Sequence, residues 1–236
     1  MEQFYRIADL TVAMDTFGRT LELAQPYVTE PVDKADIYIQ SDIENVAKKN
    51  PGMGESHIEY LASGASFYQQ LLHHGGMLLH SSAVVVDGKA YLFTAPRKTG
   101  KSTHVQLWLQ VFGERAQILN DDKPALRMVD GIWYAYGTPW SGKAGKNTNL
   151  RVPVAGIAVV ERGERNSIAP YAGAEAIRFL MEQTVRPNEP HLLMGLLQQL
   201  DSLLTQVPVW KLKCNMEPEA AVVAYEAMSG IKEGNP

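Results

Sequence analysis

The run from Ala95 to Ser102, Ala-Pro-Arg-Lys-Thr-Gly-Lys-Ser, has the residue types and spacing of a phosphate-binding loop. A P-loop reads Gly-x-x-x-x-Gly-Lys-[Ser/Thr] between a strand and a helix, and its backbone N–H groups face the phosphates. Its lysine neutralises the β- and γ-phosphates, and its hydroxyl binds Mg²⁺. We therefore predict an ATP and Mg²⁺ site whose nucleotide-binding residues are Ala95, Pro96, Arg97, Lys98, Thr99, Gly100, Lys101, Ser102 and Thr103.

The loop departs from the motif at its first position, where Ala95 replaces glycine. Alanine can hold many glycine conformations, but it reaches positive φ only at a cost in energy. A plainer interpretation of the same residues is that Thr99 to Ser102 form an ordinary turn that caps a helix. The pattern by itself leaves both interpretations open.

Two adjacent carboxylates, Asp121 and Asp122, follow the strand predicted for Ala116 to Asn120. A phosphoryl-transfer site needs a metal-binding or base carboxylate at such a strand end. Successive side chains of a strand point to opposite faces, so at most one of the pair can face the phosphates easily. We predict that one is a metal ligand or a catalytic base, and that their roles differ.

His80 lies in the strand-like run Met77 to Val86, and Asp87-Gly88 after it is a strong signal for a two-residue hairpin turn. Antiparallel return along Lys89 to Thr94 would bring His80 beside the start of the phosphate loop. His80 is therefore a candidate catalytic residue, although a histidine packed in the core is the alternative.

A second polar, glycine-rich segment runs from Gly137 to Lys143. A lysine in such a loop suits a phosphate, or it can simply lie in solvent. We take Ser141 and Lys143 as candidate substrate contacts.

The elements that must position these residues follow from the hydrophobic pattern. A phosphate loop between strand 89–94 and helix 103–112, with hairpins and later helices around it, predicts an α/β fold with a mixed sheet and C-terminal helices. The expected division is an N-terminal α/β segment, 1–75, packed on a P-loop domain, 76–236. The remaining expected strands are 35–40, 125–129, 132–136, 154–161 and 207–213, and the remaining helices are 55–73, 174–183, 189–204 and 218–228.

Composition narrows the class of protein. The 236 residues are 45% hydrophobic and 20% charged, with a net charge of −4, so the sequence favours a soluble globular protein and argues against nucleic acid as a partner. The sequence has no apolar run of the roughly 18 residues that a membrane-spanning helix needs, so we expect no membrane partner. The single cysteine, Cys214, and the lack of a signal-like start are typical of a cytoplasmic protein.

The order of three motifs resembles the catalytic domain of HPr kinase/phosphorylase and the related ATP-dependent phosphoenolpyruvate carboxykinases. The motifs are His80-Ser81-Ser82-Ala83, the Ala95 to Ser102 loop and Asn120-Asp121-Asp122, and the resemblance covers about Leu79 to Glu161. It implies that Lys101 contacts the phosphates, that Ser102 holds Mg²⁺, and that Asp121 and Asp122 supply a metal ligand and a base. It also implies that His80 lies beside the transferred phosphoryl group or a metal.

The resemblance implies an ATP-dependent kinase that phosphorylates a hydroxyl, with a serine of a small protein, peptide or small molecule as the expected acceptor. Neither the regulatory domain of HPr kinases nor the substrate-binding half of the carboxykinases is recognisable in this chain. Two alternatives therefore stay open: a nucleotide-binding protein without turnover, and a peptide-binding accessory protein on the same fold. Homo-oligomerisation also stays open.

Overall fold

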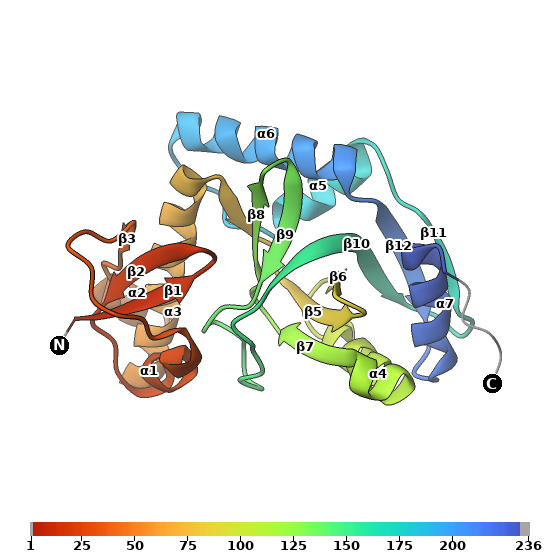
Figure 1. The fold of residues 1–236 in the computed structure, drawn as a ribbon, viewed down its shortest axis with the longest axis horizontal. Coiled ribbons are helices and arrows are strands. Elements are labelled where there is room, and N and C mark those ends of the chain that lie inside the picture. Colours follow the sequence, from red (N-terminus) through yellow and green to blue (C-terminus); the bar gives the residue numbers. More distant parts are fainter. Residues whose placement is uncertain (1, 232–236) are drawn as a thin grey trace.

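Short strands and helices form the N-terminal part of the computed structural model, which describes residues 2–231 (Figure 1). The strands β1 (Gln3–Ile7) and β2 (Leu10–Met14) form a hairpin, and β3 (Ile37–Tyr38) adds parallel to β2. The strand expected over 35–40 is thus shorter, because only Val12 and Ala13 of β2 pair with it.

Three helices complete this part: α1 (Gly18–Ala24), α2 (Ile43–Lys49) and α3 (Glu55–Leu71). The prediction of a helix over 55–73 is confirmed, except that its last turn tightens into a 3₁₀ turn that ends at Gly75 in the left-handed conformation. The aromatic side chains of Phe67 and Tyr68 pack on Trp140, so α3 shares one hydrophobic core with the rest of the molecule.

A nine-stranded mixed sheet forms the rest of the framework, with the strand order β4-β8-β9-β10-β6-β5-β7 and with β12 and β11 added beside β10. The long strand β10 pairs antiparallel with β9 at its start and then parallel with β6 and β12, so it joins the two halves of a curled sheet (Figure 1). The strands are β4 (Gly76–Leu78), β5 (Ser81–Val86), β6 (Lys89–Thr94), β7 (Ala116–Asn120), β8 (Ala125–Val129), β9 (Ile132–Tyr136), β10 (Arg151–Arg162), β11 (Ser167–Pro170) and β12 (Val209–Cys214).

The predicted single strand over 77–86 is wrong in one respect, because the chain leaves the ladder at Leu79 and His80. There the His80 N–H donates to the Gln183 carbonyl (2.7 Å), and the Thr94 hydroxyl donates to the His80 carbonyl (2.9 Å). The two pieces serve different halves of the sheet: β4 pairs with β8, and β5 pairs with β6. The hairpin at Asp87-Gly88 is confirmed, with positive φ at both residues.

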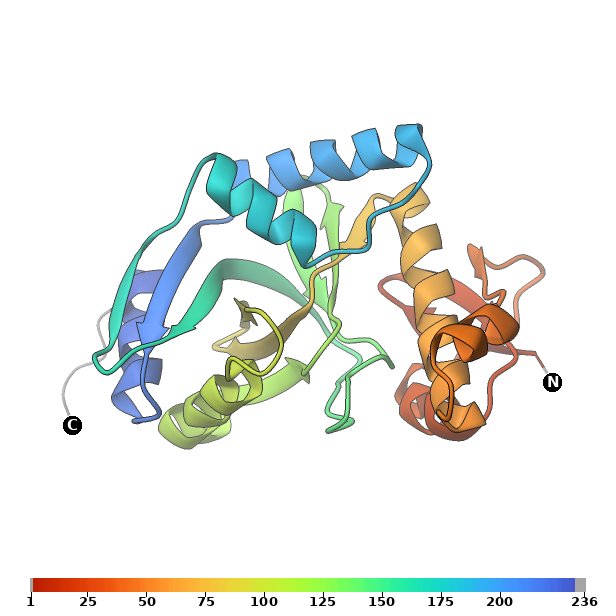
Figure 2. The same cartoon turned by 180° about the vertical axis from the view of Figure 1, so that it is seen from behind.

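Helices cover both faces of the large sheet (Figures 1 and 2). On one face, α5 (Ala174–Glu182) and α6 (Pro190–Gln206) bury leucines against β5, β6 and β10. On the other face, α4 (Lys101–Phe112) and α7 (Glu219–Ser229) bury Trp108 and Tyr225 against the same strands. The expected mixed α/β fold with C-terminal helices is confirmed, whereas β1, β2 and β11 were not among the strands predicted by residue range. Within residues 2–231 we find no helix with the length and apolarity to cross a bilayer.

Candidate active site

The Ala95–Ser102 loop lies between β6 and α4, as the motif requires. Its two positive φ angles are at Lys98 (66°) and Gly100 (123°), and Ala95 is not among the described residues that adopt one. The alanine at the first position of the loop is therefore not strained. The helix expected from Thr103 begins two residues earlier, at Lys101, so the lysine and serine belong to its first turn.

Lys101 folds back across the loop, where its Nζ donates to the Ala95 carbonyl at 3.1 Å. Burial lowers the pKa of this ammonium group, and the carboxylates of Asp122 and Asp121 oppose that shift. A half-buried cation in the first turn of a helix, where the backbone N–H groups carry partial positive charge, is an arrangement that attracts an anion.

The outer part of the loop is held from β10. Arg162, at the end of that strand, donates through Nη2 to the Lys98 carbonyl (2.7 Å) and through Nε to the Thr99 carbonyl (3.2 Å). Pro96 and Arg97 are exposed. Arg162 was not predicted; its only sequence signal is a positive charge directly after a buried strand.

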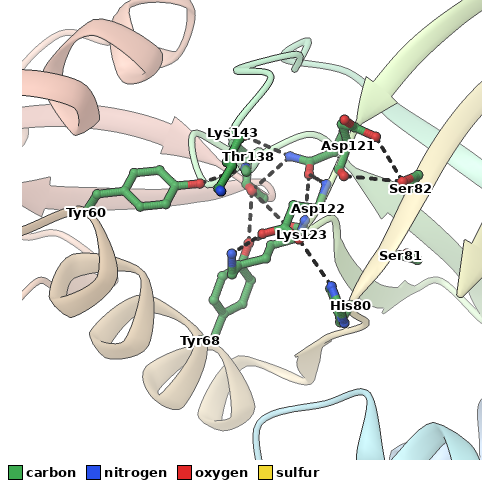
Figure 3. A network of polar contacts seen from close by, with 12 residues as sticks. Tyr60, Tyr68, His80, Ser81, Ser82, Asp121, Asp122, Lys123, Thr138 and Lys143 are labelled. Atoms are coloured by element: carbon green, nitrogen blue, oxygen red, sulfur yellow. Dashed lines mark hydrogen bonds and ion pairs between the residues drawn. The ribbon is translucent and has the colours of Figure 1, made fainter. Parts of the chain in front are cut away.

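Asp121 lies beside the serine of the loop. The Ser82 hydroxyl donates to Asp121 Oδ1 at 2.9 Å (Figure 3). The same hydroxyl lies 3.5 Å from the Ser102 hydroxyl. The described residues contain no cluster of three or more histidine, cysteine or acidic side chains that could hold a metal by themselves. One carboxylate with two hydroxyls does suit Mg²⁺, which takes one or two carboxylates and completes its shell with phosphates and water.

Asp122 faces a different set of partners. Its Oδ1 is 3.2 Å from His80 Nε2, and its Oδ2 contacts Lys123 Nζ (Figure 3). Burial by itself raises the pKa of Asp122, but the hydrogen bond from His80 and the charge of Lys123 outweigh it and lower the pKa to about 2. The His80 ring is fixed from behind, because its Nδ1 lies 3.2 Å from Gln183 Oε1. Lys123 was missed, although it directly follows the aspartate pair.

The chain turns sharply after Asn120, which makes this divergence of the two carboxylates possible. The buried Asn120 Oδ1 accepts from the backbone N–H groups of Asp122 (3.0 Å) and Lys123 (2.8 Å), and its Nδ2 donates to the Thr138 carbonyl (2.9 Å). The Thr138 hydroxyl donates to the Lys123 carbonyl (2.8 Å) and hydrogen-bonds the Tyr68 hydroxyl (2.9 Å) (Figure 3). The turn is thereby tied to α3.

The Gly137–Lys143 segment packs directly on Asp122, since a Cβ at Gly142 would lie 2.8 Å from the Asp122 Cβ. Arg19 donates to the Gly142 carbonyl, and the Tyr60 hydroxyl accepts from the Gly142 N–H at 2.8 Å. Of the two candidate substrate contacts, Lys143 is exposed, whereas Ser141 is fully buried and has no hydrogen-bond partner within the described part of the chain. Burial keeps Ser141 away from any substrate in this conformation, so that prediction needs correction.

Comparison with known proteins adds little to this geometry. Neither a protein-family model nor a curated protein sequence matches the chain. Among solved structures, the chain is similar to the Hpr(Ser) kinase/phosphatase from Coxiella burnetii, with 12% identity and a TM-score of 0.37 over 64% of this chain and 95% of that one. A similarity of this strength carries no functional inference.

Proposed function

We propose that the protein is an ATP-dependent phosphotransferase that phosphorylates a hydroxyl group, with a serine of a protein, peptide or small molecule as the acceptor. The observation that carries the proposal is the meeting of two carboxylates with different partners at one end of the Ala95–Ser102 loop. Asp121 lies with Ser82 and Ser102, and Asp122 lies with His80 and Lys123. Phosphoryl transfer requires both a metal ligand and a group that receives the acceptor's proton.

The loop supplies the phosphate contacts. Lys101 would exchange the Ala95 carbonyl for β- and γ-phosphate oxygens, and the N–H groups of the first turn of α4 would add their partial positive charge. Ser102 and Asp121 would hold Mg²⁺, which when bound neutralises the charge that develops on the transferring group.

Asp122 would receive the proton. As the acceptor oxygen forms its bond to the γ-phosphorus, the bond to the β–γ bridging oxygen breaks, ADP leaves, and the acceptor's proton passes to a carboxylate within hydrogen-bond reach. The contact with His80 keeps Asp122 ionised and oriented, because it helps to hold the pKa at about 2. Lys123, beside the same carboxylate, would stabilise negative charge on the transferred phosphoryl group.

Titration calorimetry with Mg²⁺-ATP on the wild type and on Lys101→Ala tests the binding step. We expect a large loss of affinity in the variant, and equal affinity in both proteins would contradict the proposal. Incubation with labelled ATP and serine-containing proteins, peptides or free serine then tests transfer. ATP binding without transfer to any acceptor would indicate a nucleotide-binding protein that does not turn over.

A further inference from the structure

The sheet topology determines on which side of β6 the rest of a bound nucleotide must lie. His80 directly precedes β5 and the two aspartates directly follow β7, and these strands lie on one flank of β6, whereas β10 and β12 lie on the other flank. If the γ-phosphate faces the aspartates, the nucleoside must extend toward β10 and β12. Ligands of open α/β sheets bind outside the carboxyl ends of parallel strands, and β6, β10 and β12 are parallel.

A pocket of about 420 Å³ opens in that position, between the first turns of α4 and the carboxyl ends of β10 and β12. Thr99, Gly100 and Thr103 line it, so it is continuous with the Ala95–Ser102 loop. Its apolar wall consists of Leu107, Val160 and the side chain of Met216, which is 75% exposed and lies at the rim. The volume is within the usual range of small-molecule sites.

We infer that this pocket, which we call the α4–β10–β12 pocket, binds the nucleobase and ribose of the nucleotide and does so with little discrimination between purine bases. The inference rests on the proposed function, because it assumes phosphates in the adjoining loop. Leu107 and Val160 would contact the faces of the base, and Met216 would cover it as a flexible apolar side chain.

Weak discrimination follows from how the polar side chains of the pocket are already bonded. His104 Nε2 accepts from Trp108 Nε1 at 3.0 Å, so its other nitrogen carries the proton and faces Cys214 Sγ at 3.8 Å. Burial lowers the pKa of His104 to about 4, which keeps the ring neutral in this arrangement.

All but one of the remaining polar side chains of the pocket have partners as well. Asn215 Nδ2 donates to the Glu164 carbonyl (3.3 Å), and its Oδ1 accepts from the Glu217 N–H (3.0 Å). Glu161 is paired with Lys211, Arg162 holds the loop carbonyls, and Thr99 donates to Pro96. Of the polar side chains that line the pocket in the described chain, Thr103 alone makes no such bond, and it lies at the phosphate end. The pocket therefore offers the edge of a bound base few free polar groups that could distinguish an amino group from a carbonyl.

The decisive experiment compares two ligands, Mg²⁺-ATP and Mg²⁺-tripolyphosphate, on the wild type, Leu107→Trp and Met216→Ala. Leu107→Trp fills the pocket from α4, and Gln106→Trp, at the adjacent exposed position of the same helix, is the matched control. We expect Leu107→Trp to lose at least about tenfold in ATP affinity, a change of about 1.4 kcal/mol, and to bind tripolyphosphate like the wild type. Met216→Ala should show a smaller loss in the same direction, and Gln106→Trp should show none.

Retained tripolyphosphate binding also demonstrates that a variant is folded, and Met216→Ala serves if Leu107→Trp does not fold. Wild-type ATP affinity in both pocket variants would overturn the inference and leave the proposed function standing. Failure of the wild type to bind either ligand would overturn both. For discrimination, the wild-type affinities for ATP and GTP should differ by less than about tenfold, the factor that one hydrogen bond contributes; a larger preference would overturn this part.

Discussion

Two groups of side chains hold the turn from Asn120 to Lys123, and they differ in character. On the side of the Ala95–Ser102 loop the contacts are ionic or polar and partly exposed, as those of Asp122 with Lys123 and His80, whose side chains are each about a quarter exposed. On the side of α3 they are buried and mostly neutral, and Tyr68 and Thr138 tie the turn to the helix. The first group can exchange its partners for a ligand. The second has no solvent to exchange with.

The difference implies that the two groups have separate roles, although both contact the same few residues of the chain. Charged groups whose pKa is shifted, here Asp122 and Lys101, are typical of sites that do chemistry, whereas a fully bonded buried network fixes geometry. We therefore expect substitutions on the loop side to change rate and ligand binding, and substitutions on the α3 side to change stability. Four predictions test this contrast, from the largest expected effect to the smallest.

The first prediction concerns the carboxylates on the loop side. Asp122→Asn keeps the shape of the side chain but removes the proton acceptor, so the rate of transfer should fall by about 10²–10⁴, while ATP affinity changes less because Lys101 and the loop remain. Asp121→Asn removes a proposed Mg²⁺ ligand, so it should mainly reduce the increase in ATP affinity that Mg²⁺ gives. Single-turnover assays and calorimetry measure the two effects.

The matched control is Asp130→Asn, which makes the same chemical change at an exposed hairpin turn whose positive φ asparagine tolerates. It should transfer phosphate at the wild-type rate. If Asp121→Asn and Asp122→Asn also transfer phosphate at the wild-type rate, the proposed mechanism is wrong.

The second prediction concerns the α3 side. Thr138→Val preserves volume but removes a buried hydroxyl that bonds Lys123, Tyr68 and Asn120, so the free energy of unfolding should fall by about 1–3 kcal/mol. ATP affinity should stay unchanged, because the loop is held from β6 and β10. Urea unfolding measures the loss. Thr138→Ser retains the hydroxyl and should lose less; if Val is as stable as Ser, the network does not contribute as proposed.

The features that the sequence predicts correctly depend on contacts between neighbouring residues, and the features that it misses depend on contacts between residues far apart in the chain. The hairpins at Asp87-Gly88 and Asp130-Gly131, the helix from Glu55 and the strand before Asn120 are set by neighbouring residues, and all are present. The Ala95–Ser102 motif, with its lysine and serine, is likewise formed by residues that are neighbours in the chain. A short motif therefore indicated where phosphate contacts could lie without any knowledge of the fold.

The other contacts of the site join residues far apart in the chain, and no local pattern reveals them. Tyr68 and Thr138 are 70 residues apart, and Arg19 and Gly142 are 123 apart. The break at His80 depends on a carbonyl of Gln183, 103 residues later in the chain. The burial of Ser141 likewise depends on how its loop packs against α3, so the local sequence could not show that this candidate substrate contact is buried.

The third prediction uses the pKa of Asp122, which is lowered from 3.8 to about 2 in the folded protein. Because the folded value lies below the unfolded one, the stabilisation is present above about pH 4 and is lost as the pH falls toward 2. It amounts to something on the order of 2 kcal/mol. The stability difference between the wild type and Asp122→Asn should shrink by that amount between pH 5 and pH 2, as followed by urea unfolding. A constant difference would contradict the assigned ion pairs.

The fourth and smallest effect is expected where the two sides meet, at Arg19. Its Nη2 bonds the carbonyls of Gly142 and Lys143, and its guanidinium lies 5.3 Å from the centre of the Tyr60 ring. Arg19→Lys keeps the charge, but a single ammonium group cannot reproduce the planar contacts to two carbonyls and a ring. The 139–146 segment should therefore loosen against Asp122, while the fold and ATP affinity stay intact.

Hydrogen exchange of the 139–146 segment measures this loosening without any knowledge of the acceptor. Exchange should become faster by less than about tenfold, because replacing the guanidinium by an ammonium group weakens hydrogen bonding by no more than about 1 kcal/mol. Tyr60→Phe, which removes the acceptor of the Gly142 N–H, should act on the same amides, whereas Arg6→Lys, at an exposed arginine of β1, should not. If Arg19→Lys leaves exchange in this segment unchanged, the N-terminal part does not position the 139–146 segment over Asp122. The segment would then be held by β9 and β10 alone.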